Sequence, residues 1–124
     1  MRFMIMVKMR EDAGAPPPAL IDAMGQQMAE LFQSGVMVDA GGLCESSAST
    51  EVRVHDGELS VTDGPFTEAK ELVGGYSIVE VHSREEAVEL GRRVMHLHKT
   101  YWPGWEGAAE VRQIAGSDEG PSSA

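Results

Sequence analysis

The chain has 124 residues, of which 42% are hydrophobic and 24% are charged, a composition typical of one compact domain. Twenty acidic and ten basic residues give a formal net charge of −10, which disfavours direct binding to nucleic acid and to acidic membrane surfaces. No apolar run is long enough to span a membrane, and the first residues lack the features of a secretory signal, so we expect a cytoplasmic protein.

Residues 2–9, RFMIMVKM, predict the first strand. Phe3 and Ile5 alternate with Met4 and Met6, so apolar side chains lie on both faces of this strand. A strand of this kind belongs in a sheet that is covered on both sides.

A helix and a short strand follow. Three consecutive prolines fit only the start of a helix, and apolar residues recur beyond them at intervals of three and four positions. This pattern predicts a helix over residues 17–34. Residues 36–42, VMVDAGG, then predict a short strand that ends in two glycines.

The middle of the chain predicts a β-hairpin over residues 50–64, TEVRVHDGELSVTDG. Val52 and Val54 face one way in its first strand, Asp56-Gly57 supplies the turn, and aliphatic residues alternate again in the return strand. His55 alternates with the valines, which places it on the solvent side.

The last third of the chain predicts a strand, a helix and a final strand. Residues 75–82, GYSIVEVH, form the first of these, and Ser83 with Glu86 has the spacing of a capping box for the helix. Residues 109–114, AEVRQI, alternate as the last strand.

Without the hairpin, the predicted order is strand, helix, strand, strand, helix, strand, the split βαβ arrangement of a ferredoxin-like α+β domain. The hairpin is then an insertion. Both helices cover one face of the sheet, so we expect a partner sheet to cover Met4 and Met6 in a homodimer. We expect the domain to span residues 1–115 and the acidic segment 116–124 to be a flexible tail.

Few residues suit metal or nucleophilic chemistry. Cys44 is the single cysteine, so no internal disulfide can form, and we expect its side chain to be buried. His96 and His98 diverge on a helix and can share a metal ion only if the helix has already ended there. The chain has no phosphate-binding glycine motif and no nucleophile elbow, so we expect neither a metal nor a cofactor.

The tetrapeptide Asp63-Gly64-Pro65-Phe66 is the most unusual local feature. It has two interpretations. The aspartate either accepts backbone N–H bonds in a tight turn, with glycine permitting a positive φ, or it is a catalytic carboxylate. Lys8 extends the outer face of the first strand, where it is either solvated or places an ammonium at the rim of a cavity between two sheets.

The segment VTDGPFTEAKELVGGY, residues 61–76, resembles the signature of the YCII-related, DGPF-domain (YciI-like) family. Further similar segments extend the resemblance to residues 1–114. The resemblance implies a ferredoxin-like fold that forms a dimeric α+β barrel. It also implies a small-molecule enzyme with a suspected aspartate and histidine pair, since a few relatives are lyase-like enzymes that act on aromatic ring compounds.

Carried over by position, the resemblance makes Asp63 the motif aspartate and His98 the histidine that precedes the WPGW segment. These two are the candidate catalytic residues, and Lys8, Phe66 and Tyr76 are the candidate substrate contacts. We expect a cofactor-independent lyase or isomerase-like enzyme with acid/base chemistry on an unknown small molecule. The alternative is a non-catalytic module that binds a small ligand or a protein, because many relatives are encoded near extracytoplasmic-function sigma factors.

Overall fold

The computed structural model describes residues 1–66 and 71–117 of the chain. Residues 67–70 of the segment 61–76 lie outside the described residues, as does most of the predicted tail, residues 118–124. The elements are β1 (Arg2–Met9), η1 (Glu11–Ala13), α1 (Pro18–Gln33), β2 (Met37–Gly42), η2 (Ser46–Ala48), β3 (Thr50–His55), β4 (Glu58–Asp63), β5 (Leu72–Glu80), α2 (Arg84–Tyr101) and β6 (Gly107–Gln113).

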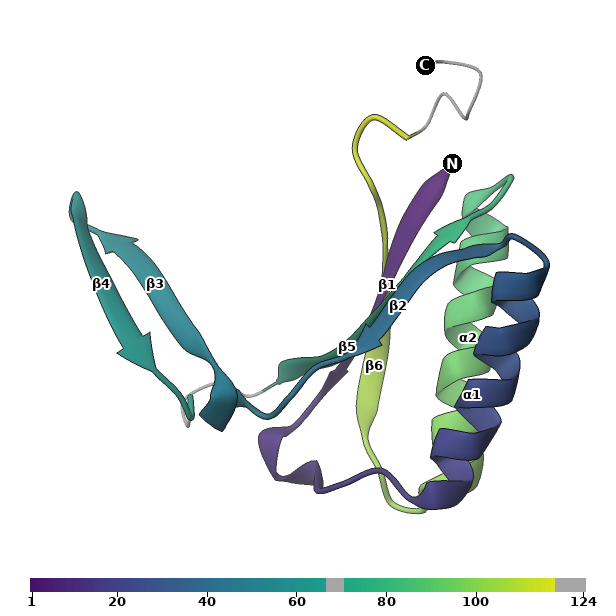
Figure 1. Ribbon diagram of the computed structural model, residues 1–124, viewed down its shortest axis with the longest axis horizontal. Coiled ribbons are helices and arrows are strands. Elements are labelled where there is room, and N and C mark those ends of the chain that lie inside the picture. The colour runs from purple at the N-terminus through teal and green to yellow at the C-terminus, as the bar shows by residue number, and fades with distance from the viewer. Residues whose placement is uncertain (67–70, 118–124) are drawn as a thin grey trace.

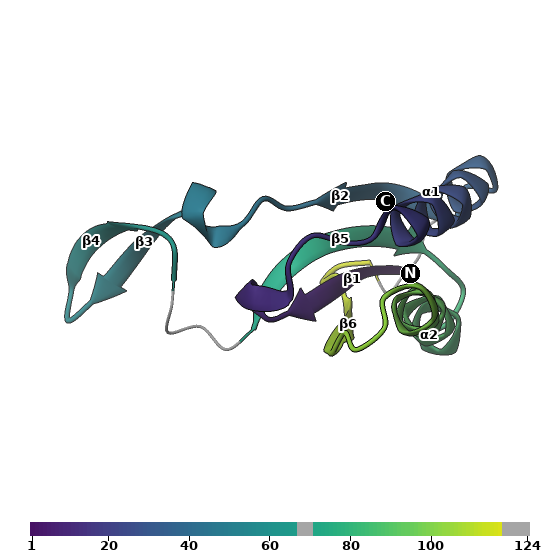
Figure 2. The same cartoon turned by 90° about the horizontal axis from the view of Figure 1, so that it is seen from below.

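Four strands form an antiparallel sheet in the order β2-β5-β1-β6, and β3 pairs with β4 in a separate hairpin. Both helices pack on one face of the sheet and leave the other face open (Figure 1; Figure 2). This α+β arrangement is compatible with the predicted ferredoxin-like fold. Within the described part of the chain, no helix is both long and apolar enough to cross a membrane.

The alternation of β1 decides which side chains face the helices. Phe3 and Ile5 are each 2% exposed and belong to the core beneath α1 and α2. Met4 and Met6 point to the open face and are half-buried. The predicted two-sided apolar pattern of this strand is therefore confirmed.

The predicted start of the second helix is also confirmed. The Ser83 hydroxyl accepts a hydrogen bond from the backbone N–H of Glu86 at 3.2 Å, which satisfies one free donor of the first turn. The Glu86 carboxylate accepts a bond from the backbone N–H of His82 at 3.0 Å, one residue before the position that a complete capping box uses.

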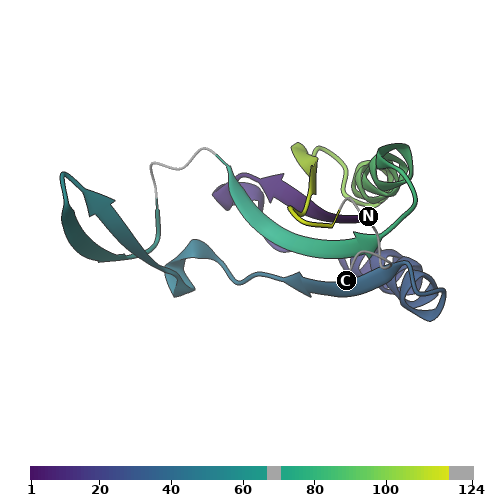
Figure 3. The ribbon, with the colours of Figure 1, turned by 90° about the horizontal axis from the view of Figure 1, so that it is seen from above.

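The β3–β4 hairpin extends away from the sheet on the side opposite the helices (Figure 1; Figure 3). Its register pairs Val52 with Val61 and Val54 with Leu59, so the aliphatic residues share one face as predicted. These four side chains are 65–74% exposed, because no element of the described chain covers that face.

Three boundaries or burial expectations differ from the structure. β5 begins at Leu72 and β6 at Gly107, earlier than predicted, because Met9 at the end of β1 pairs with both residues. Cys44, expected to be buried, is exposed because it lies in the loop between β2 and η2, which no helix covers.

The Asp63–Phe66 turn packs against η2 at the base of the hairpin. The Gly64 N–H donates to the Ser49 carbonyl at 2.8 Å, and the Phe66 N–H donates to the Ser46 hydroxyl at 3.1 Å. A Cβ placed on Gly64 would lie 1.8 Å from the Ser46 carbonyl oxygen. Glycine is therefore required at this position by the close approach of two backbone segments.

We expect Gly64→Ala to lower the free energy of unfolding by about 1–3 kcal/mol, because the added methyl group must displace the η2 backbone. Urea denaturation followed by circular dichroism measures this change. The matched control is Gly25→Ala, since Gly25 lies inside α1 with open space around it and alanine is the better helix former. The close approach would be refuted by an equal stability of the Gly64 variant and the wild type.

Candidate functional site

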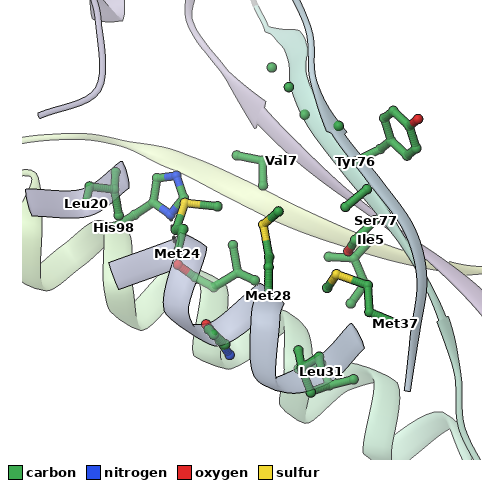
Figure 4. Close-up of a pocket in the computed structure, with 18 of the residues that line it drawn as sticks. Ile5, Val7, Leu20, Met24, Met28, Leu31, Met37, Tyr76, Ser77 and His98 are labelled. Atoms are coloured by element: carbon green, nitrogen blue, oxygen red, sulfur yellow. Dashed lines mark hydrogen bonds between the residues drawn. The ribbon is translucent and has the colours of Figure 1, made fainter. Parts of the chain in front are cut away.

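A cavity of about 230 Å³ lies between the two helices and the covered face of the sheet (Figure 4). Its walls are mostly apolar side chains. They come from β1 (Ile5, Val7, Met9), from α1 (Leu20, Ile21, Met24, Met28, Leu31), from β2 and β5 (Met37, Ala40, Val79) and from α2 (Leu90, Val94). The polar side chains that line it are those of Gln27, Ser77 and His98, and Tyr76 borders it.

His98 brings an imidazole to this apolar cavity from the last turns of α2. The residue is 3% exposed, and its ring extends from the helix toward the cavity (Figure 4). Its Nδ1 lies 2.8 Å from the Val94 carbonyl oxygen, one helical turn earlier. A carbonyl oxygen can only accept, so Nδ1 carries the proton and the neutral ring keeps a lone pair on Nε2.

The environment of His98 favours the neutral imidazole. Burial lowers the pKa of His98 below its ordinary value of 6.5, and the hydrogen bond to Val94 opposes this shift without cancelling it. The neutral ring, with Nε2 available as a proton acceptor, is therefore the predominant form at neutral pH.

Two tryptophans from the segment after α2 hold the imidazole. The ring centroids of His98 and Trp105 are 4.5 Å apart, and those of His98 and Trp102 are 6.4 Å apart. The tryptophan rings also stack on each other at 6.0 Å. This aromatic packing restricts the rotation of the imidazole.

Tyr76 borders the cavity through its position in β5, but its ring lies on the open face of the sheet (Figure 4). Its hydroxyl donates to the Asp39 carboxylate at 3.3 Å. The negative charge of Asp39 raises the pKa of the Tyr76 phenol above its ordinary value of 10.0. The phenol therefore stays protonated at neutral pH.

Lys8 lies on the same open face, since it follows Met4 and Met6 at intervals of two along β1. Its ammonium donates to the Glu110 carboxylate at 3.1 Å. This hydrogen bond lowers the pKa of Glu110, and Arg112 acts in the same direction. Lys8 is thus separated by the sheet from the cavity that contains His98.

Asp63 and Phe66 lie at the base of the hairpin. The exposed carboxylate of Asp63 accepts a hydrogen bond from the Thr50 hydroxyl at 2.9 Å. Phe66 lines a different cleft of about 690 Å³, together with Cys44 and other loop residues. Neither residue lines the cavity that contains His98.

Of the five residues singled out from the sequence, the structure therefore places His98 inside the cavity and Tyr76 at its border. The apolar wall from α1 was not recognised as part of a site, although Leu20, Met24 and Met28 gave the signal for the buried face of that helix. Across residues 1–66 and 71–117, no three His, Cys, Asp or Glu side chains are grouped to hold a metal ion.

Comparison with known proteins identifies a family and a relative. A family model described as the YCII-related domain matches residues 1–98. An uncharacterized protein of Rhizobium meliloti (strain 1021) is 29% identical over 83 residues, which are 67% of this chain and 63% of that protein. The chain therefore matches less than two thirds of the length of this relative.

The buried imidazole predicts how stability depends on pH. Below pH 6.5 the unfolded chain binds a proton at His98 that the folded chain resists, so the free energy of unfolding decreases as the pH falls through this value. At higher pH both the folded and the unfolded chain carry the neutral imidazole, so this loss of stability is absent. Urea denaturation at a series of pH values measures the slope.

A His98→Phe variant keeps an aromatic ring and removes this titration. We therefore expect a weaker pH dependence in the variant. Identical slopes for the two proteins would show that His98 titrates as it does in the unfolded chain.

Proposed function

The chain belongs to the YCII-related domain family, and we propose that it binds a small organic molecule between its helices and sheet and uses His98 for acid/base chemistry there. The observation that carries this proposal is a neutral imidazole, 3% exposed, in a mostly apolar cavity of about 230 Å³. Apolar cavities with few well-placed polar groups are typical of small-molecule sites. A buried histidine with a shifted pKa is typical of general acid/base catalysis.

The chemistry that suits this geometry is a lyase or isomerase reaction. Nε2 of His98 removes the proton from an enol O–H group of the ligand, the electron pair of the O–H bond forms a carbonyl group, and the electron pair of the neighbouring C=C bond moves to the next carbon. The imidazolium then returns the proton to another atom, or a leaving group departs with an electron pair. No electrons are gained or lost overall, so the reaction needs no redox cofactor.

The protein contributes orientation as well as the base. The bond from Nδ1–H to the Val94 carbonyl keeps the lone pair on Nε2, and the packing on Trp105 fixes the plane of the ring. A general base must reach the proton that it abstracts at about 2.6–3.2 Å between heavy atoms. A ring held at two points needs little reorganisation to do so.

We also propose that the protein is a homodimer that pairs the open faces of two sheets as an α+β barrel. Met4 and Met6 are apolar side chains on a face that the described helices do not cover, and Ile78 lies opposite Met4 on β5. The hairpin extends on this same side with its aliphatic face exposed (Figure 1). One two-fold interface buries both surfaces. Each Å² of apolar area removed from water stabilises the dimer by about 25 cal/mol.

The dimer gives the remaining predicted residues a role. Lys8 and Tyr76 lie on the open face, so in our proposal they contact a ligand only in the space between the two sheets. Asp63 lies on a hairpin that leads away from the cavity of its own chain, and the cavity of the second copy lies behind that copy's sheet. In our proposal it therefore acts as an acid/base partner of His98 only where the hairpin passes around the edge of the second sheet.

A second candidate function is a non-catalytic, cytoplasmic module that binds a small ligand and acts with a sigma factor. The observation that favours it is that His98 is the single acid/base side chain inside the cavity among the described residues. Many acid/base reactions use two such groups. In this alternative the cavity only binds its ligand. A variant without the imidazole that still binds the ligand then keeps the full function.

Binding in the cavity can be tested without knowledge of the substrate. A thermal-shift screen of small organic molecules should find compounds that raise the melting temperature of the wild type. We expect Met28→Trp to abolish these shifts, because the larger side chain fills the cavity. The control is Met95→Trp, since Met95 is a half-buried methionine of α2 that does not line the cavity. Equal shifts in both variants would place the ligand elsewhere.

The dimer is tested by light scattering. We expect twice the chain mass for the wild type and a monomer for Met4→Lys, because a lysine at this position lies opposite Arg112 and buries an unpaired charge in the interface. The control is Val88→Lys, since Val88 is an exposed residue of α2, on the helix side. A monomeric wild type at micromolar concentration would exclude both the dimer and the barrel.

Mixed dimers of two variants test the role of Asp63. If its carboxylate serves the partner's cavity, mixing Asp63→Asn chains with His98→Phe chains restores proton transfer that neither variant performs alone. Deuterium exchange at the α-carbon of a bound ketone, followed by NMR, measures this transfer. Full activity of Asp63→Asn by itself limits this residue to its hydrogen bond with Thr50.

A further inference from the structure

We infer, on the basis of the proposed function, that the ligand of the His98 cavity is a neutral, mainly apolar molecule of one or two rings that donates one O–H or N–H hydrogen bond to Nε2 of His98. The inference names the substrate class, and it follows from four features of the cavity: the charge of its lining, the two helix ends beside it, the hydrogen-bonding state of His98, and its volume.

The lining excludes a charged ligand. Among the residues that the structure describes, no Lys, Arg, Asp or Glu lines the cavity, and its polar side chains are those of Gln27, Ser77 and His98. Lys8 is on the other face of the sheet and is paired with Glu110. A carboxylate or phosphate would lose its hydration here without gaining a cation, which is costly. An ammonium group would equally lack an anion.

The first turn of α1 borders the cavity through Leu20 and Ile21, but it is a poor site for an anion. The free N–H groups at the start of a helix normally attract anions. Here Pro17 and Pro18 have no N–H, and both Leu20 and Ile21 donate their N–H groups to the Pro17 carbonyl at 3.0 and 3.2 Å. Most of the donors that would hold a carboxylate or phosphate are therefore missing or occupied.

The second helix end also opposes an anion. His98 lies three residues before Tyr101, the last residue of α2, where the carbonyl groups give the helix its negative end. The formal net charge of −10 on the whole chain acts in the same direction at long range. A neutral ligand avoids both effects.

The hydrogen-bonding state of His98 requires a donor on the ligand. Nδ1–H is used by the Val94 carbonyl, and within the described residues this is the one hydrogen bond of the imidazole. Nε2 of the neutral ring accepts and cannot donate. A ligand without a donor leaves this buried acceptor unsatisfied, whereas a hydroxyl or N–H group satisfies it.

The volume sets the size of the ligand. An apolar cavity of about 150 Å³ is large enough to hold benzene. The present cavity of about 230 Å³ therefore admits a substituted single ring or a small fused pair of rings. Ser77 lies at the opposite end of the cavity from His98 (Figure 4), so the apolar walls of α1 and β1 extend along the middle of such a molecule.

Three probes of nearly equal size separate these features: para-cresol is neutral and donates a hydrogen bond, para-xylene is neutral without a donor, and benzoate is anionic. Dissociation constants are measured by calorimetry with the full chain, above the ordinary pKa of histidine. We expect para-cresol to bind about three- to tenfold more tightly than para-xylene, the effect of one net hydrogen bond. We expect benzoate to bind at least about tenfold more weakly than para-cresol, because its charge stays unpaired.

Two variants test whether the preference for para-cresol over para-xylene depends on Nε2 of His98. His98→Phe removes the acceptor and keeps a ring, so we expect para-cresol and para-xylene to bind equally. Ser77→Ala removes the hydroxyl at the opposite end of the cavity and should keep the preference. If His98→Phe does not fold, 4-methylanisole is compared with para-cresol in the wild type, since it keeps the oxygen but has no O–H donor. We expect it to bind no more tightly than para-xylene.

The outcomes distinguish this inference from the proposed function on which it rests. A preference for para-cresol that disappears in His98→Phe supports the inference. Tightest binding by benzoate, equal binding of the two neutral probes, or loss of the preference in Ser77→Ala alone overturns it and leaves small-molecule binding in the cavity intact. If none of the three probes binds and the thermal-shift screen also finds no ligand, both proposals fail.

Discussion

The structure depends first on the alternation of β1, an inner strand that pairs with β5 on one side and β6 on the other. Successive side chains of a strand point to opposite faces, so Phe3, Ile5 and Val7 must lie under the helices if Met4 and Met6 lie outside. The first set forms the core and one wall of the cavity. The second set lies on the open face. The cavity and the open face of the sheet therefore share one strand without sharing a side chain.

Burial of His98 links this architecture to chemistry. A buried imidazole without partners is costly, and here the helix itself supplies one partner, the Val94 carbonyl. That bond selects the tautomer, so the second nitrogen presents a lone pair to an apolar space. The same burial that lowers the pKa of His98 keeps this lone pair available at neutral pH. Burial thus favours the neutral imidazole, and one local hydrogen bond defines its tautomer.

Local sequence patterns predicted the order of the helices and strands, the Ser83 cap and the exposed hairpin turn, because these features depend on neighbours within a few residues. The cavity depends on contacts between α1, α2 and β5, which no local pattern reports. Lys8 illustrates the difference: its place on the outer face was predicted, but the pairing with Glu110 on β6 requires knowledge of the sheet order. Cys44 was wrongly expected to be buried, since the composition of a loop does not reveal whether a helix covers it.

The Asp63–Phe66 segment and the His98 cavity are separate within one chain, and their geometry suggests different duties. The close approach of the Ser46 carbonyl requires glycine at position 64. Asp63 is hydrogen-bonded to Thr50, and Phe66 is hydrogen-bonded to Ser46, so the segment joins the hairpin to η2. Every one of these contacts orients the hairpin, and none touches the cavity. A hairpin with an exposed aliphatic face is of use only where a second surface meets it. In the dimer that we propose, the motif sets the geometry of the interface, and the interface in turn decides whether the Asp63 carboxylate reaches the base in the other chain.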